Sequence, residues 1–214
     1  MDSNLVKKYF FVKKIVIEEG YNDEIIWQKN IIFQQISESD FLREISWVIL
    51  SSGMREKVIS KYFPIISNCF YNWISAEKIT INKISCLEEA LKIFNHKKKI
   101  ASIIAAAELI FKRGFDWFKN EIVKDPINKL KEFDFIGPIT VFHLAKNIGL
   151  DVAKPDRHLV RIALNEGFDD VQEFCKKISK VSGDSVPVVD VVLWRYATIE
   201  PKYLDILKKI RFVT

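Results

Sequence analysis

The sequence predicts an all-α fold, and three of its features support this. Glycine and proline number only 7 and 6 among 214 residues, which favours helices with short connections over a many-stranded sheet. Apolar residues recur at spacings of three and four from about residue 39 onward, the helical period. Several of these stretches stop at a glycine, such as Gly114, Gly149 and Gly167, a common residue just past a helix end.

The first forty residues do not predict one kind of element. Residues 10–18 and 24–35 each combine strand and helix signals. The helical pattern then becomes clear, and Ser39 or Asp40 is expected to cap a helix that Gly53 interrupts.

The middle of the chain continues with helices. Asp125-Pro126 is a typical helix start, and the lysines at 97–99 are expected to form a solvated helix start. The expected helices cover residues 54–63, ended by Pro64, then 87–94, 97–113, 115–123 and 125–133.

The last third is also expected to be helical. Residues 185–197 are apolar enough for a buried strand as well, and we favour a helix because the rest of the pattern is helical. The expected helices cover residues 140–148, 157–165, 170–181, 185–197 and 203–210.

The segment 125–149 predicts a helix-hairpin-helix. A tight connection around Gly137-Pro138 joins two short helices. Such a turn leaves backbone N–H groups at the start of the second helix, where they and the helix dipole bind a phosphate without reading sequence. The alternative is an ordinary antiparallel helix pair with a glycine turn.

Asp156 is the candidate catalytic carboxylate. It lies 17 residues after Ile139, beyond one amphipathic helix, a glycine and a short loop. A fixed carboxylate stabilises the positive charge that develops on a sugar when its N-glycosidic bond breaks. The alternative role is to cap the helix that begins at Arg157, and both roles are compatible.

These motifs resemble a known family of DNA repair enzymes. The runs are Phe135-Ile136-Gly137-Pro138-Ile139-Thr140, Lys154-Pro155-Asp156-Arg157-His158-Leu159-Val160-Arg161-Ile162 and Trp47-Val48-Ile49-Leu50-Ser51-Ser52-Gly53-Met54-Arg55. Their order and spacing resemble the HhH-GPD DNA glycosylases across residues 41–197. The resemblance implies a two-lobed helical fold with a DNA-binding groove between the lobes. One lobe would hold residues 40–138 and the other 1–39 plus 139–214, with the hairpin 125–149 at the junction.

The resemblance also implies an activity, in which a damaged base is flipped out of duplex DNA and its N-glycosidic bond hydrolysed with Asp156 in the catalytic role. The implied phosphate-binding residues are Phe135, Gly137, Ile139, Thr140, Arg157 and Arg161. The implied base pocket contains Trp47, Phe142, His143 and Trp194, and the implied wedge that fills the gap in the base stack contains Met54 and Arg55. For the aromatic residues and Met54, core packing is the alternative.

Two departures from the family pattern bear on the chemistry. Bifunctional members have a lysine where this chain has Ile139, so the missing amine favours a monofunctional enzyme in which water attacks. Lys146, on the same helical face, is the alternative nucleophile, or else a solvated or phosphate-binding lysine. The cysteines Cys69, Cys86 and Cys175 form no paired motif, so neither an iron–sulfur cluster nor a zinc site nor any other cofactor is expected.

The net charge of +5 permits nucleic-acid binding without proving it. We expect the partner to be damaged double-stranded DNA. We expect the protein to be a monomer without a membrane segment, located inside the cell in the cytoplasm or at the nucleoid. The hairpin form Phe133-Asp134-Phe135-Ile136-Gly137-Pro138, without a first glycine, resembles 3-methyladenine glycosylase I more than endonuclease III. Together with the missing lysine, this resemblance implies an alkylated purine as the favoured lesion, and oxidised guanine, uracil and mismatched adenine stay open. The rival functions are a bifunctional glycosylase/lyase for oxidised guanine and a non-catalytic helix-hairpin-helix DNA-binding module.

Overall fold

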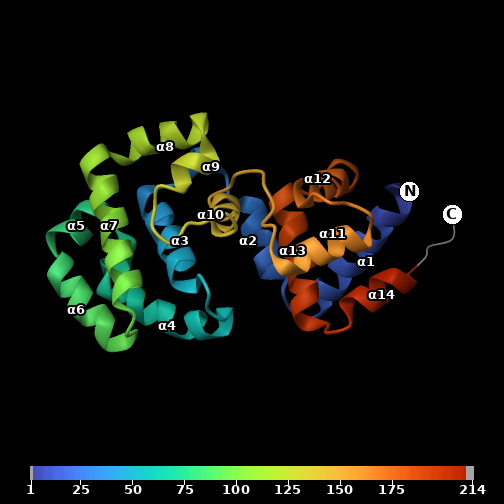
Figure 1. Cartoon of the computed structure of the whole chain (residues 1–214), viewed down its shortest axis with the longest axis horizontal. Helices are drawn as coiled ribbons and strands as arrows, with labels where there is room; N and C mark the ends of the chain where they lie inside the picture. Colours follow the sequence, from blue (N-terminus) through green and yellow to red (C-terminus); the bar gives the residue numbers. More distant parts are fainter. Residues whose placement is uncertain (1, 211–214) are drawn as a thin grey trace. The chain divides into compact units, whose positions relative to one another are not determined.

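The computed structural model describes residues 2–210, and every regular element among them is helical (Figure 1). The predicted all-α class is therefore confirmed. No helix in this range is both long and apolar enough to cross a bilayer. The α-helices are α1 Asp2–Glu18, α2 Asn22–Asn30, α3 Glu38–Ser51, α4 Glu56–Cys69, α5 Ala76–Ile81, α6 Lys83–Ile93, α7 Lys97–Arg113, α8 Phe115–Lys124, α9 Pro126–Leu130, α10 Thr140–Asn147, α11 Arg157–Asn165, α12 Val171–Ser182, α13 Val186–Ile199 and α14 Tyr203–Lys209.

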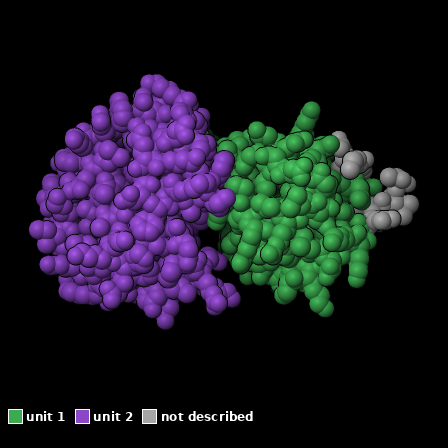
Figure 2. All heavy atoms as spheres, viewed as in Figure 1, with its two compact units in different colours: residues 1–33, 149–214 green, residues 34–148 purple. Residues whose placement is uncertain are grey.

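The chain divides into two compact units (Figure 2). Unit 1 joins residues 1–33 to 149–214, and unit 2 contains residues 34–148. The boundaries differ from the expected lobes, 40–138 and 1–39 plus 139–214, because α10 packs against α3 and α9 and so belongs wholly to unit 2. The helix-hairpin-helix is thus a feature of one unit.

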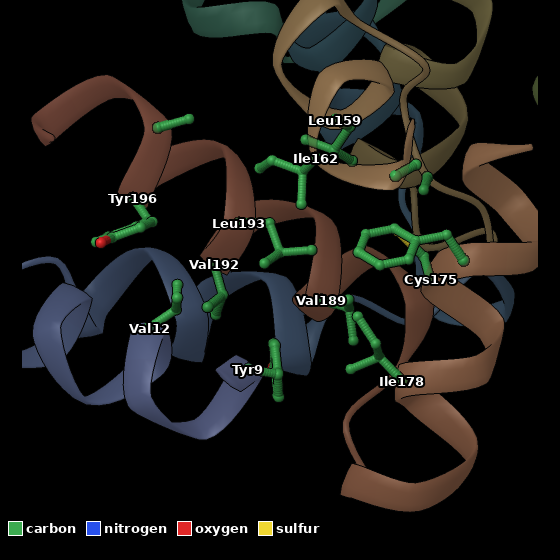
Figure 3. Close-up of a cluster of buried hydrophobic side chains, with 14 of the residues drawn as sticks. Tyr9, Val12, Leu159, Ile162, Cys175, Ile178, Val189, Val192, Leu193 and Tyr196 are labelled. Carbon is green, nitrogen blue, oxygen red and sulfur yellow. The ribbon is translucent and has the colours of Figure 1, made fainter. Parts of the chain in front are cut away.

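The ambiguous N-terminal segment is helical because its apolar face is buried. Tyr9, Val12 and Val16 follow the helical period along α1 and are almost fully buried, against the side chains of α12 and α13. Figure 3 shows Tyr9 and Val12 within this cluster. The helix α13 that they contact is the segment 185–197 for which helix was preferred over strand, and that preference is confirmed.

Unit 2 is built around α3, whose start differs from the prediction. Ser37, not Ser39 or Asp40, is the N-cap, and its side chain and that of Asp40 bond to each other's backbone N–H groups in a capping box. Farther along, Phe41 packs against Phe118 and Phe133 with ring centroids 5.8 and 6.0 Å apart.

The prediction that Pro64 ends a helix is wrong, since α4 continues through it to Cys69. An interior proline costs a helix about 3 kcal/mol. Ile59, Phe63 and Ile66 lie on either side of it and are buried, and each such side chain stabilises by about 1.5–3 kcal/mol. Burial of this face therefore outweighs the proline.

The expected solvated start of α7 is also only partly right. Lys97 and Lys98 are exposed, but Lys99 is only 2% exposed.

Candidate functional site

The hairpin consists of α9, a turn over residues 131–139, and α10. Asp125 caps α9 by accepting a hydrogen bond from the N–H of Asn128 at 3.3 Å, and Pro126 occupies the first helical position. α9 ends at Leu130, earlier than the predicted residue 133. Phe133 and Ile136 of the turn are buried, so the turn is fixed to the core of unit 2.

Thr140 closes the hairpin turn. Its hydroxyl oxygen accepts a hydrogen bond from the N–H of Gly137 at 2.7 Å and donates to the carbonyl of Phe135 at 2.8 Å. The N–H of Gly137 is therefore engaged inside the turn. The N–H groups of Ile139 and Thr140 donate to no acceptor within residues 2–210. Both N–H groups lie at the start of α10, where they could meet an anion.

The unusual backbone of the turn is at Phe135, not at the glycine. Phe135 has φ = +64°, the left-handed region that costs a residue with a side chain about 1–2 kcal/mol. A Cβ added at Gly137 would meet only the Thr140 hydroxyl, at 3.9 Å. The protein itself thus leaves room at Gly137, so a need for glycine there would have to come from a group approaching from outside.

Several of the candidate residues lie on or next to helix α10, and their side chains differ in how far they are exposed to solvent. Ile139, just before it, is 44% exposed, and Phe142 and His143 are half-buried. Lys146 is only 6% exposed and its charge acts on Glu44, whose buried carboxylate accepts a hydrogen bond from Asn147 at 2.9 Å. Burial raises the pKa of Glu44. Lys146 thus lies in a buried polar cluster about 10 Å along the helix from Ile139, at 1.5 Å per residue.

The turn after α3 carries the candidate wedge. Met54 is 39% exposed, and its N–H donates to the carbonyl of Ser51 at 3.0 Å. Arg55 is exposed and precedes α4. Trp47, one of the pocket candidates, is half-buried and meets Phe63 edge-on at 5.1 Å. Trp47 therefore packs within unit 2 while keeping part of its ring accessible.

In unit 1, Asp156 is the N-cap of α11. One carboxylate oxygen, Oδ1, accepts hydrogen bonds from the N–H groups of His158 and Leu159 at 2.8 and 3.1 Å. The other oxygen, Oδ2, bonds to no group within the described residues, and the side chain is half-buried. The capping role is thus present, and it fixes the carboxylate while leaving one oxygen open.

Two side chains that were not among the predicted site residues hold the loop that carries Asp156. Asp190 of α13 is 2% exposed and accepts a hydrogen bond from the N–H of Lys154 at 2.5 Å. Gln172 of α12 bonds to both the N–H and the carbonyl of Ala153. A lone acidic residue in the otherwise apolar start of α13 was the signal available for Asp190.

Helix α11, which Asp156 caps, carries two basic side chains close to this carboxylate. Arg157 and Arg161 are exposed, one turn apart. His158 lies 3.4 Å from the hydroxyl of Tyr203, and its pKa is lowered mainly by burial. The exposed arginines are available to an anionic partner.

Trp194, the remaining pocket candidate, is half-buried on α13. The guanidinium of Arg195 lies 4.6 Å from its ring centroid and pairs with Glu24 at 2.5 Å. Within residues 2–210, no three His, Cys, Asp or Glu side chains are grouped as metal ligands, and Cys69, Cys86 and Cys175 form no disulfide there.

Comparison with known proteins gives a likeness of structure. No protein-family model matches the chain, and no curated protein matches it by sequence. Among solved structures, the chain is similar to the 8-oxoguanine DNA glycosylase of Thermotoga maritima, with a TM-score of 0.59 and 16% identity over 91% of this chain and 96% of that chain. The chain therefore shares the all-helical fold of that glycosylase, and the all-helical class agrees with the prediction from the sequence.

Proposed function

We propose that the protein is a DNA glycosylase of base excision repair. The observation that carries the proposal is Asp156, a carboxylate fixed as the N-cap of α11 with one oxygen free. The fold shared with an 8-oxoguanine DNA glycosylase supports it. A carboxylate that is held still by one oxygen and exposes the other suits the stabilisation of a developing cation.

The DNA backbone would be gripped by the hairpin turn and by α11. The N–H groups of Ile139 and Thr140 would donate to a phosphate, aided by the positive end of α10. The space beside Gly137 would let that phosphate approach the backbone closely. Arg157 and Arg161 would add salt-dependent contacts that do not read sequence.

The reaction would be hydrolysis of the N-glycosidic bond of a flipped nucleotide. As the bond between sugar and base breaks, its electron pair leaves with the base and the sugar becomes cationic. Oδ2 of Asp156 would stabilise that cation and orient a water molecule, whose oxygen forms the new bond to the sugar. The proton of the water goes to the departing base, and the products are the free base and an abasic site.

The absence of an amine at position 139 favours a monofunctional enzyme. The side chain of Ile139 is exposed but carries no amine that could attack the sugar. Lys146 carries an amine, but it is only 6% exposed and lies in a polar cluster with Glu44. The lesion is proposed to be a damaged purine. The hairpin sequence favours an alkylated one, and the likeness to an 8-oxoguanine DNA glycosylase favours oxidised guanine as the second candidate.

Oligonucleotide duplexes that each contain one lesion would test the proposal. The purified chain is expected to release at least one of alkylated purine, 8-oxoguanine, uracil or mismatched adenine, leaving a site that alkali cleaves. Strand cleavage without alkali, with a borohydride-trapped adduct that Lys146→Ala abolishes, would favour the bifunctional alternative. DNA binding with no release of any base would favour the non-catalytic module.

A further inference from the structure

Lys99 is a buried lysine that the proposed chemistry does not use. It is 2% exposed, and within residues 2–210 its ammonium forms no ion pair with a carboxylate. Burial lowers its pKa to about 8. Burying a charge without a counter-ion costs free energy. A lysine at this position is therefore expected to have a role other than packing.

The ammonium of Lys99 caps the end of α3. It donates to the carbonyls of Leu50 and Ser52, each at 2.5 Å. These carbonyls belong to the helix end, where backbone acceptors lack helical partners and the dipole is negative. The segment that follows, residues 52–55, carries Met54. Lys99 therefore fixes the base of the turn that holds the candidate wedge.

The same residue also contacts the hairpin turn. Its ammonium lies 5.7 Å from the centre of the Phe135 ring, within cation–π range. His96, which caps α7 by accepting from the N–H of Lys99 at 3.3 Å, meets Phe135 edge-on at 6.1 Å. The carbonyl of Phe135 is bonded to Thr140. One buried group thus contacts both turns, which are at least 80 residues apart in sequence.

We propose that Lys99 is a positioning residue that sets the spacing between the wedge turn, residues 52–55, and the phosphate-binding turn, residues 135–140. In the proposed function, on which this inference rests, that spacing is the distance from the gripped phosphate to the gap in the base stack. A lowered pKa would also suit a Schiff-base nucleophile. Lys99 is too deeply buried for that role, and its donors are already engaged with carbonyls.

The first test needs no DNA. Amide hydrogen exchange would be compared in the native chain, Lys99→Met and Lys112→Met, the last removing an exposed lysine from the other end of α7. We expect Lys99→Met to raise exchange about tenfold in both turns and the control to change neither. Faster exchange confined to residues 52–55 would show that Lys99 only caps the end of α3, and this result would overturn the inference. Unchanged exchange in both turns would overturn it as well. Should Lys99→Met not fold, Lys99→Gln, which keeps two N–H donors, is expected to loosen both turns to a smaller extent.

The second test measures the consequence for DNA. The ratio of the dissociation constants for an intact duplex and for one with an abasic-site analogue reports how well the wedge and the phosphate grip act together. Lys99→Met is expected to reduce this ratio about tenfold while affinity for the intact duplex stays within about twofold. An unchanged ratio would overturn the inference. If the native chain itself showed no preference for the abasic analogue, the proposed function would fail, and the exchange measurement would still decide the role of Lys99.

Discussion

Two substitutions at Asp156 separate its capping role from its proposed catalytic role. Asp156→Ala removes both hydrogen bonds that Oδ1 accepts at the start of α11, a loss of about 1 kcal/mol, together with about 0.5 kcal/mol from the helix dipole. Asp156→Asn keeps an oxygen for the cap and loses only the dipole contribution of about 0.5 kcal/mol. For a chain of this length, about 1 kcal/mol moves Tm by about 2–4 °C.

The two variants are therefore expected to differ in stability but not in activity. Tm should fall by about 3–6 °C for Asp156→Ala and about 1–2 °C for Asp156→Asn, measured by thermal denaturation. Single-turnover base release should fall about 100-fold or more in both, which corresponds to about 2.7 kcal/mol of transition-state stabilisation.

Asp170 provides the matched control. It caps α12 by accepting from the N–H of Glu173 at 2.7 Å, and it is exposed. Asp170→Ala should lower Tm about as much as Asp156→Ala while leaving base release within about twofold of the native rate. If Asp156→Asn retained a third or more of the native rate, the carboxylate would be only a helix cap, and the catalytic argument would be refuted.

Four further outcomes are expected. Ile139→Lys places an amine at an exposed position beside the hairpin turn, so borohydride should trap a covalent adduct with lesion DNA that the native chain does not form; no adduct would mean that residue 139 does not face the sugar. Gly149→Ala should cost at least about 2 kcal/mol in urea denaturation, because φ is +91° and the new Cβ would lie 2.6 Å from the backbone nitrogen of Phe33; a smaller loss would contradict this close approach. Phe135→Gly should be more stable than Phe135→Ala by about 1 kcal/mol, since φ is +64°; equal stabilities would show no strain. Burial lowers the pKa of Lys99 from 10.5 to about 8, so the unfolded chain binds this proton more tightly than the folded chain does. The unfolding free energy of the native chain should therefore rise between pH 8 and 10.5 relative to that of Lys99→Met. Parallel pH profiles of the two unfolding free energies would contradict the lowered pKa.

The features that the sequence predicted correctly depend on neighbours along the chain. The N-cap at Asp156 and the turn around Gly137 follow from a few consecutive residues, whose local hydrogen bonds decide the structure. The helix α13 follows from one long apolar segment. Such local features can be predicted from the sequence without knowledge of the tertiary contacts.

The features that were missed or wrong depend on distant contacts. Lys99 looked like a solvated lysine because its acceptors, Leu50 and Ser52, lie 49 and 47 residues away in the chain. Asp190 meets the backbone of Lys154 from 36 residues away. The helix continues through Pro64 because of burial on its core face. In each case a contact between residues far apart in the sequence decides the structure, and the local pattern does not report it.

The most direct measurement is a crystal structure of the chain bound to duplex DNA that contains an abasic-site analogue. We expect Oδ2 of Asp156 to lie within about 4 Å of the sugar of the extruded nucleotide, close enough for charge stabilisation. We also expect the N–H groups of Ile139 and Thr140 to donate to a phosphate of the same strand. A complex in which the DNA contacts neither α11 nor the hairpin turn would contradict the proposed function.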